Sequence, residues 1–291
     1  MAWSERQASM LKEMGLRVQA MPSAALAVDR AVPVAVPAPA ARATPIKSMV
    51  MVADADVTAP ARPARTPSAE TRSDAMRIAA LDWPELRSAV ASCQACQLCE
   101  GRTQTVFGVG HVNAHWMVVG EAPGEQEDAQ GEPFVGKSGQ LLDNMLRALG
   151  LSRKGVEPSG VELNGIEAKA DVDASKSVYI ANSVKCRPPG NRNPTADELA
   201  KCEPYLMRQV ALLQPKIILA MGRFAVQSLL RSAEPIGKLR GRVHDYCGVP
   251  LIVTYHPAYL LRNLEEKARA WDDLCLAAQT FDEQVQGRRA P

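Results

Sequence analysis

Residues 116–134 read Trp-Met-Val-Val-Gly-Glu-Ala-Pro-Gly-Glu-Gln-Glu-Asp-Ala-Gln-Gly-Glu-Pro-Phe, and a helix-like segment, Lys137–Leu149, follows them. Four apolar residues ending in glycine are typical of a strand buried on both faces of a parallel sheet, and Gly-Glu-Ala-Pro-Gly predicts a chain reversal. Open α/β sheets carry their chemistry on loops at the carboxyl ends of such strands. The stretch therefore predicts strand, acidic loop and helix, and the loop fits either a solvated surface or an active site.

Length and composition predict a soluble globular body. The chain has 291 residues, of which 46% are apolar, and contains no apolar run long enough to span a membrane. Its first residues mix charges with short apolar steps and show no signal peptide, so we expect a cytoplasmic, reducing location. There the seven cysteines favour metal ligation or buried thiols over a disulfide framework.

The amino-terminal quarter differs in composition from the rest. Residues 1–20 predict a short helix, either a frayed terminus or a peptide that binds a partner. Residues 21–73 are rich in Ala, Pro and Val and predict a disordered linker, so the folded domain should span 74–291. Residues 1–75 hold nine Lys and Arg against seven Asp and Glu, which accounts for the net charge of +2. The folded body is therefore almost neutral, and any affinity for DNA must come from local patches.

Apolar runs and helical segments alternate after residue 74. The expected strands are 116–119, 178–181, 216–221 and 250–253, and the expected helices are 76–92, 137–149, 196–213 and 264–283. Thr195 and Glu198 have the spacing of a capping box. Residues 151–177 are polar and predict an inserted surface loop. The alternation predicts an α/β fold of three layers, α/β/α, with a central four-stranded parallel sheet.

Polar residues follow three of the expected strands. Glu121, Asn182 and His256 should meet at one edge, because parallel strands all end on the same side of a sheet. Taken alone, a His before Pro is more often structural, and an Asn commonly starts a turn. An Asn side chain can nevertheless accept from an imide N–H while it donates to a carbonyl, which matches the edge of uracil. Convergence of these loops beside Phe134 favours a site for a flat polar ligand.

The cysteines form two pairs. Cys93 and Cys96 have Cys-x-x-Cys spacing, whereas Cys186 and Cys202 lie on either side of a loop that enters a helix. Four thiolates suit a tetrahedral zinc ion or a four-iron cluster, and spacing does not separate these two metals. Cys99, Cys247 and Cys275 are left over, and Cys275 in the last helix is expected to be a buried thiol.

Three longer motifs point to a family. They are GEAPGEQEDAQGEPFVGKSGQLLDNML at 120–146, NSVKCRPPGNRNPTADELAKCEPYL at 182–206 and TYHPAYLLRN at 254–263. In this order, with the cysteine pattern, they resemble the bacterial and archaeal iron–sulfur uracil-DNA glycosylases, called family 4 of their superfamily. The resemblance covers about residues 74–283. It implies an enzyme that flips uracil out of DNA and hydrolyses its N-glycosidic bond, which leaves an abasic site and initiates base-excision repair.

The resemblance also implies roles for individual residues. Cys93, Cys96, Cys186 and Cys202 match the ligands of a [4Fe-4S] cluster. Phe134 matches the aromatic residue that stacks on uracil, Asn182 matches the amide that binds uracil N3 and O4, and His256 matches the histidine near uracil O2. Glu121 and Glu127 match the carboxylates that place or activate water. Ala122 is expected to contact the substrate and occupies the position at which other families have an aspartate. A water-activating aspartate is therefore absent there, and the identity of the carboxylate that activates water stays open. Their place in the chain, and not the resemblance, suggests the residues at DNA phosphates: Lys238, Arg240 and Arg242 in a basic loop between the third and fourth strands, and Arg187, Arg192 and Arg262 beside the motifs. Ordinary solvated surface charge is the alternative for each of them.

We expect a monomer that acts on single- or double-stranded DNA containing uracil, with the peptide at 1–20 recruiting a repair or replication partner. Three other classes of function remain as alternatives, and each requires a sequence feature that this chain lacks or does not match. A relative that holds uracil-DNA without turnover carries a histidine in an inserted basic loop, and no such insertion is found. A nucleotide-binding enzyme would need the Walker Lys-Ser/Thr, and an iron–sulfur electron carrier would not separate its cysteine pairs so widely.

Overall fold

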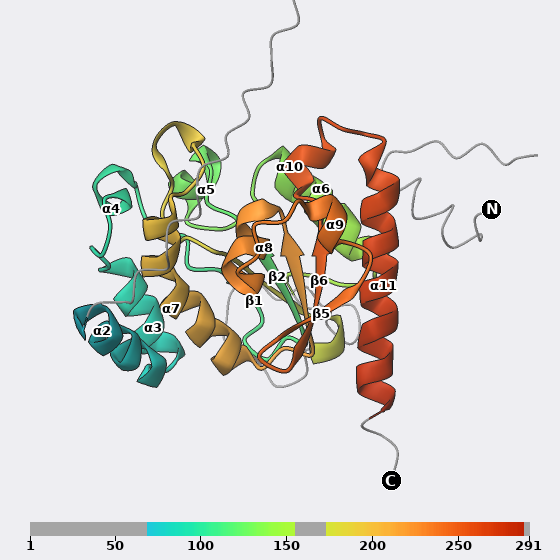
Figure 1. The fold of residues 1–291 in the computed structure, drawn as a ribbon, viewed down its shortest axis with the longest axis horizontal. Helices are drawn as coiled ribbons and strands as arrows, with labels where there is room; N and C mark the ends of the chain where they lie inside the picture. The colour runs from blue at the N-terminus through green and yellow to red at the C-terminus, as the bar shows by residue number, and fades with distance from the viewer. Residues whose placement is uncertain (1–68, 155–172, 288–291) are drawn as a thin grey trace, which may run out of the picture. The chain divides into compact units, whose positions relative to one another are not determined.

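The computed structural model describes residues 69–154 and 173–287 (Figure 1). The peptide expected at 1–20, most of the linker expected at 21–73 and the centre of the loop expected at 151–177 lie outside these ranges. The described chain begins with helix α2, Ala69–Ala80, so helical structure starts ahead of the expected boundary at residue 74. Within the described ranges, no helix is long and apolar enough to cross a membrane.

A six-stranded sheet in the order β1-β3-β2-β4-β6-β5 forms the centre of the fold. Its inner strands are parallel to one another: β3 (Val178–Asn182), β2 (Trp116–Gly120), β4 (Ile217–Met221) and β6 (Val249–Thr254). The expected four-stranded parallel sheet is thus confirmed as the middle of a larger mixed sheet. Two edge strands that were not predicted complete the sheet: β1 (Val109–Gly110) pairs antiparallel with β3, and β5 (Val243–Tyr246) pairs antiparallel with β6.

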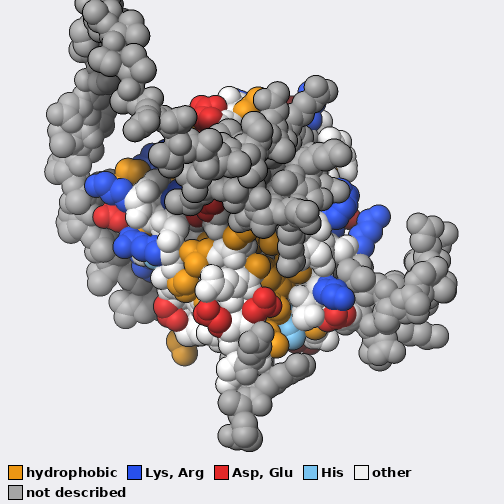
Figure 2. All heavy atoms as spheres, turned by 90° about the vertical axis from the view of Figure 1, so that its right-hand side faces the viewer, with side chains coloured by type: hydrophobic (Ala, Val, Ile, Leu, Met, Phe, Trp, Pro, Cys, Tyr) orange, Lys and Arg blue, Asp and Glu red, His pale blue; other side chains and the backbone are white. Residues whose placement is uncertain are grey.

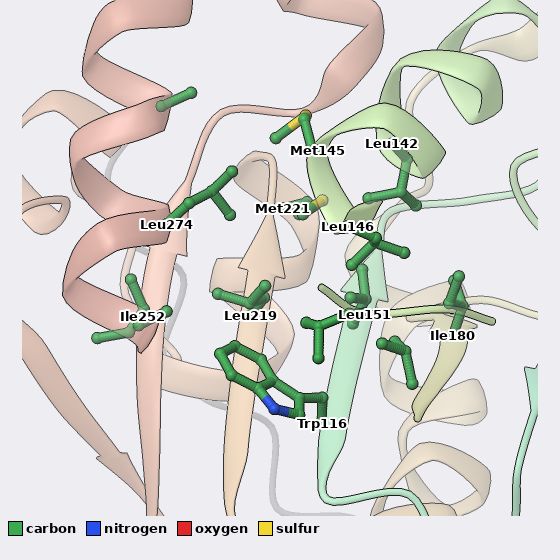
Figure 3. Close-up of a cluster of buried hydrophobic side chains, with 14 of the residues drawn as sticks. Trp116, Leu142, Met145, Leu146, Leu151, Ile180, Leu219, Met221, Ile252 and Leu274 are labelled. Atoms are coloured by element: carbon green, nitrogen blue, oxygen red, sulfur yellow. The ribbon is translucent and has the colours of Figure 1, made fainter. Parts of the chain in front are cut away.

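Helices cover both faces of the sheet, as the three-layer prediction requires. One face carries α6 (Lys137–Ala148) and α11 (Glu266–Gln286), and the other carries α7 (Ala196–Leu213) and α8 (Arg223–Leu230). Side chains of β2 alternate between these layers: Trp116 and Val118 join the first cluster, and Met117 joins the second. Figure 3 shows part of the first cluster, where Leu274 of α11 and Leu146 of α6 lie on either side of Leu219 of β4 in this view.

The local sequence explains where several helices begin. α7 starts at the expected capping box, because Thr195 and Glu198 exchange hydrogen bonds. The single helix expected over 76–92 is wrong: two helices occur, α2 and α3 (Trp83–Ala91), because Asp82 forms a capping box of its own that starts α3.

Shorter elements complete the described ranges. The loop expected after β2 contains a helical turn and a half, α5 (Glu125–Gln130), which the sequence analysis missed because Gly and Pro flank it. The remaining helical segments are α4 (Leu98–Gly101), η1 (Ala174–Lys176), η2 (Pro189–Asn191), α9 (Ile236–Leu239) and α10 (Pro257–Leu260). Of these, α5 and α10 matter most for function, because they follow the carboxyl ends of β2 and β6.

Candidate active site and cysteine pocket

A cleft of about 770 Å³ opens at the carboxyl edge of the parallel strands. Glu121, Asn182 and His256 all line it, so the structure brings the three expected loops together. Of the other predicted site residues, Ala122, Glu127, Phe134, Arg192 and Arg262 also line this cleft. The residues Arg187, Lys238, Arg240 and Arg242 lie outside its lining. The four predicted metal-binding cysteines line a separate pocket.

Asn182 is the last residue of β3 and is almost fully buried, with 2% of its surface exposed. Its Oδ1 atom has no hydrogen-bond partner among the described residues. Gly120 is paired with Asn182 across the sheet, and a Cβ atom on Gly120 would collide with this oxygen. An unpaired buried acceptor costs about 1–3 kcal/mol, which a hydrogen bond from a ligand or a water molecule would recover.

Phe134 supplies a flat apolar wall of the cleft. Its ring stacks against the His256 ring, with centroids 5.2 Å apart and an interplanar angle of 24°. Gly120 is needed here as well, because a Cβ atom on it would lie 2.6 Å from the Phe134 ring. An aromatic face stacks on any nucleobase, so selectivity between bases has to come from polar neighbours such as Asn182.

His256 follows β6 and caps α10. Its Nδ1 accepts a hydrogen bond from the Ala258 N–H at 3.1 Å, which assigns the proton of the neutral ring to Nε2. Burial lowers the pKa of His256 to about 4; the Arg262 charge adds to this effect and the Glu127 charge opposes it. At neutral pH the ring is therefore an uncharged hydrogen-bond donor in the cleft.

Glu121 directly follows β2 and is held by the start of α8. Its Oε1 accepts the Phe224 N–H at 3.1 Å. Gly222 precedes this helix with φ of 93°, and a Cβ atom on it would lie 2.5 Å from the same oxygen. Burial raises the pKa of Glu121, and the backbone N–H groups of Phe224 and Arg223 lower it in part. The carboxylate is fixed in place with an increased proton affinity, which suits a general base.

Glu127 closes the loop that leads from β2 to α6. Its Oε2 accepts the Gly124 N–H at 3.1 Å, and its Oε1 accepts the Val135 N–H at 3.0 Å. The side chain thereby joins the two ends of the loop, and its charge acts on His256. This geometry suits a residue that positions the loop, while the expected contact of Glu127 with water stays a prediction.

The second pocket gathers five cysteines. Cys93, Cys96, Cys99, Cys186 and Cys202 all line it, so Cys99 joins the four expected ligands. Two N–H groups donate to sulfur: the Arg102 Nη1 to Cys186 Sγ at 3.1 Å, and the Lys185 backbone N–H to Cys202 Sγ at 3.3 Å. Such donors stabilise metal-bound thiolates.

The pocket offers sulfur as its ligand atoms, which suits a metal that binds thiolates. Burial raises the pKa of Cys202 to about 12 and also raises the pKa values of Cys96 and Cys186, so the thiolates need a metal to form. Within 69–154 and 173–287, no three Cys, His, Asp or Glu side chains are arranged to hold one metal ion. A four-iron cluster, by comparison, is held by one thiolate at each of its four irons.

Comparison with known proteins identifies the family. The sequence pattern of the Uracil DNA glycosylase superfamily matches residues 107–275. The chain belongs to this superfamily. A Type-4 uracil-DNA glycosylase of Thermotoga maritima is 38% identical over 182 residues, which cover 62% of this chain and 83% of the relative. One from Sulfurisphaera tokodaii is 40% identical over 211 residues (68% and 86%), and a Type-5 uracil-DNA glycosylase of Pyrobaculum aerophilum is 35% identical over 158 residues (53% and 66%).

The basic residues of this glycosylase-superfamily chain that are expected at DNA differ in how many ion pairs and hydrogen bonds they make with other protein residues. Lys238 and Arg242 are exposed and have no ion pair with another described residue. Arg262 lines the cleft beside His256. Arg192 donates to both carboxylate oxygens of Glu198, at 2.9 and 2.6 Å, and holds the pKa of Glu198 down to about 2.

Two further arginines are tied to neighbours. Arg187 donates through Nε to Asn191 Oδ1 at 2.8 Å. Arg240 is only 16% exposed and donates through Nε at 3.0 Å to the fully buried carboxylate of Asp273. A phosphate contact of Arg240, which stays a prediction, has to compete with this ion pair.

Acidic and basic side chains both occur on the visible part of the face in Figure 2, so charge of one sign does not dominate there.

The glycosylase cleft also contains residues that the sequence analysis did not single out. Arg223 and Phe224 come just after β4, and Tyr255 comes just after β6. Their position after a parallel strand was a usable signal, the same one that pointed to Asn182. Tyr259 stacks on Tyr255 with ring centroids 5.1 Å apart, and both lie within the motif at 254–263.

Proposed function

We propose that this chain flips uracil out of DNA and hydrolyses its N-glycosidic bond, leaving an abasic site that base-excision repair then processes. The observation that carries the proposal is the unpaired Oδ1 of Asn182 in a cleft that also contains Phe134. Uracil offers N3–H to this oxygen, while its O4 accepts from the amide of the same side chain. Membership of the superfamily and the Type-4 relatives support the same reaction.

Asn182 also accounts for selectivity against cytosine. Cytosine has an acceptor at N3 and a donor at C4, so each polar atom of the Asn182 amide would face a like partner. A site built to pair with a substrate donor rejects the analogue that lacks it by about 10⁴–10⁵ in rate. Stacking on Phe134 contributes ~1–3 kcal/mol toward the cost of extruding the base.

The mechanism follows from His256 and Glu121. As the bond between uracil N1 and the sugar C1′ breaks, its electron pair moves into the uracil ring and negative charge grows on O2. The neutral His256 donates Nε2–H to that oxygen. Water adds to C1′ and loses a proton; we assign its orientation and deprotonation to Glu121, because both oxygens of Glu127 are bound to backbone N–H groups.

Cys93, Cys96, Cys186 and Cys202 would hold a [4Fe-4S] cluster, which would cross-link distant segments of the chain. Hydrolysis transfers no electrons, so the expected contribution of the cluster is structural. Lys185, which is fully buried next to Cys186, connects the cysteine pocket to the active site. Its Nζ donates to the Asn182 carbonyl at 2.9 Å and to Gln209 Oε1 at 2.6 Å. The cysteine pocket thereby supports the strand end that presents Asn182.

We assign DNA phosphate contacts first to Lys238, Arg242 and Arg262, with Arg187, Arg192 and Arg240 as secondary candidates. We further propose that the chain acts as a cytoplasmic monomer and that the peptide at 1–20 binds a repair or replication partner. Co-purification of such a partner with the full chain, but not with a chain altered at Leu11 and Met14, would support the last assignment.

Base selectivity tests the proposed function. Labelled oligonucleotides that differ only in one base, uracil, cytosine or thymine, are incubated with the purified chain and the free base is quantified. The expected result is release of uracil alone. Retention of the uracil oligonucleotide without release would instead show binding without turnover, and release of cytosine would contradict the role of Asn182.

A further inference from the structure

Arg153 lies behind the aromatic wall of the cleft, and only 13% of its side chain is exposed. Its Nη1 donates to the Pro133 carbonyl at 3.0 Å, and its Nη2 donates to the Phe134 carbonyl at 3.2 Å. The guanidinium is fixed in turn by Asp143 of α6, whose Oδ1 accepts from Nε at 2.7 Å. One mostly buried side chain thus binds two consecutive carbonyls of the segment that carries the stacking ring.

The backbone at Phe134 requires such support. Its φ is 56°, in the left-handed region that a residue with a side chain seldom adopts. A strained residue of this kind persists only where its surroundings over-determine it. The Phe134 carbonyl is packed so closely on Gly139 of α6 that a Cβ atom there would overlap the carbonyl oxygen.

The two sides of Phe134 are held by different residues. Arg153 binds the carbonyls of Pro133 and Phe134, and Glu127 binds the N–H of Val135 at 3.0 Å. The Glu127 contact is part of the loop closure already described, whereas the contacts of Arg153 come from a residue beyond the carboxyl end of α6. The plane of the ring depends on both, since a change in φ or ψ at Phe134 would rotate the ring out of the cleft wall.

We infer that Arg153 is a positioning residue for uracil binding, which acts by holding Phe134 in the orientation that stacks on the flipped base. The inference rests on the proposed function of the cleft. A guanidinium suits this task because its planar fork delivers several N–H groups in fixed directions, which the ammonium of lysine does not. Asp143 keeps the fork aligned with the two carbonyls.

The test compares four variants with the wild-type chain. Arg153→Met removes the donors and keeps an apolar stem, Arg153→Lys keeps the charge without the fork, and Asp143→Asn removes the anchoring charge. Arg147→Met is the matched control, because Arg147 is exposed on α6 and, among the described residues, its side chain bonds only to Asn144, one turn earlier in the helix.

We expect Arg153→Met to raise KM for a uracil-containing single strand, and the inhibition constant of free uracil, by about tenfold, as partial loss of base stacking would. The turnover number kcat should change less than KM. Asp143→Asn and Arg153→Lys should shift the same constants in the same direction by smaller factors, and Arg147→Met should shift neither. A change in kcat alone, with uracil affinity intact, would overturn the inference.

A double-mutant cycle with Phe134→Leu separates positioning from general stability. Once the ring is gone, Arg153→Met should cost less than about twofold further in KM. Equal factors in both backgrounds would mean that Arg153 acts independently of Phe134 and would refute the inference.

A crystal structure of Arg153→Met provides a readout that needs no turnover. We expect Phe134 to leave the positive-φ region and its ring to leave the cleft wall; an unchanged ring would overturn the inference. Failure of the wild-type chain to release uracil would instead count against the proposed function, so the two failures are distinguishable.

Discussion

Removal of the His256 donor should slow uracil release by a large factor and leave substrate affinity nearly intact. The Ala258 N–H occupies Nδ1, so the neutral ring of His256, which lines the cleft, carries its proton on Nε2. Loss of one fixed donor at a developing negative charge lowers kcat by about 10²–10³. His256→Ala should fall in this range when uracil release from a labelled single strand is measured, with KM changed little.

The pH dependence follows from the same environment. Burial holds the pKa of His256 at about 4. At pH 6 about 1% of the rings are then protonated, against about three-quarters for an unperturbed histidine. Because the folded pKa lies below the unfolded one, the unfolded state binds more protons between these two values. His256 therefore destabilises the fold as the pH falls through that window, and catalysis should show no step near the ordinary histidine pKa.

Nuclear magnetic resonance of the chain labelled with ¹⁵N-histidine measures this ring directly. The chain has four histidines, and the signal lost in His256→Gln identifies the one in the cleft. We expect a neutral ring protonated at Nε2 down to about pH 5. A ring that titrates near its ordinary pKa, a proton on Nδ1, or full activity of His256→Ala would show that His256 is not the neutral donor proposed here.

Gly120→Ala should cost about 1–3 kcal/mol by overpacking, and uracil affinity should fall more than thermal stability does, because the new methyl group meets Asn182 and Phe134, the two side chains that we propose contact the base. Arg240→Met leaves the buried carboxylate of Asp273 unpaired and should lower the free energy of unfolding in urea by about 3–5 kcal/mol. Arg242→Ala should leave stability unchanged and reduce the salt dependence of DNA binding by about one unit of slope. The reverse pattern would make Arg240 the phosphate contact. Cys186→Ala should lose iron and thermal stability together, and a variant that keeps its melting temperature and full activity would contradict a structural cluster.

The sequence predicted those parts of the fold that depend on short-range pattern. The apolar run at 116–119 and its three counterparts are buried on both faces, so each appears as a continuous apolar stretch. The edge strand β5 mixes His244 and Asp245 with apolar residues and therefore carries no such signal. The helix boundary at Asp82 was readable, because the capping spacing is present, but the apolar pattern on both sides favoured one continuous helix.

The candidate site shows the same division between local and long-range information. Asn182 and His256 were predictable, because each follows a strand whose carboxyl end meets the others at one edge. The contacts of Glu127 with Val135 and of Arg153 with Phe134 join residues that no helix or strand period relates. Only the folded chain shows that these two charged residues both serve the loop that carries the ring.

Uracil release by the purified chain and by Asn182→Ala, with iron and sulfide counted on the same samples, tests the proposed reaction most directly. We expect release by the wild-type chain, a loss of several powers of ten in Asn182→Ala, and equal iron content in both. Equal release by the two proteins, or no release by a folded and iron-loaded wild-type chain, would contradict this expectation.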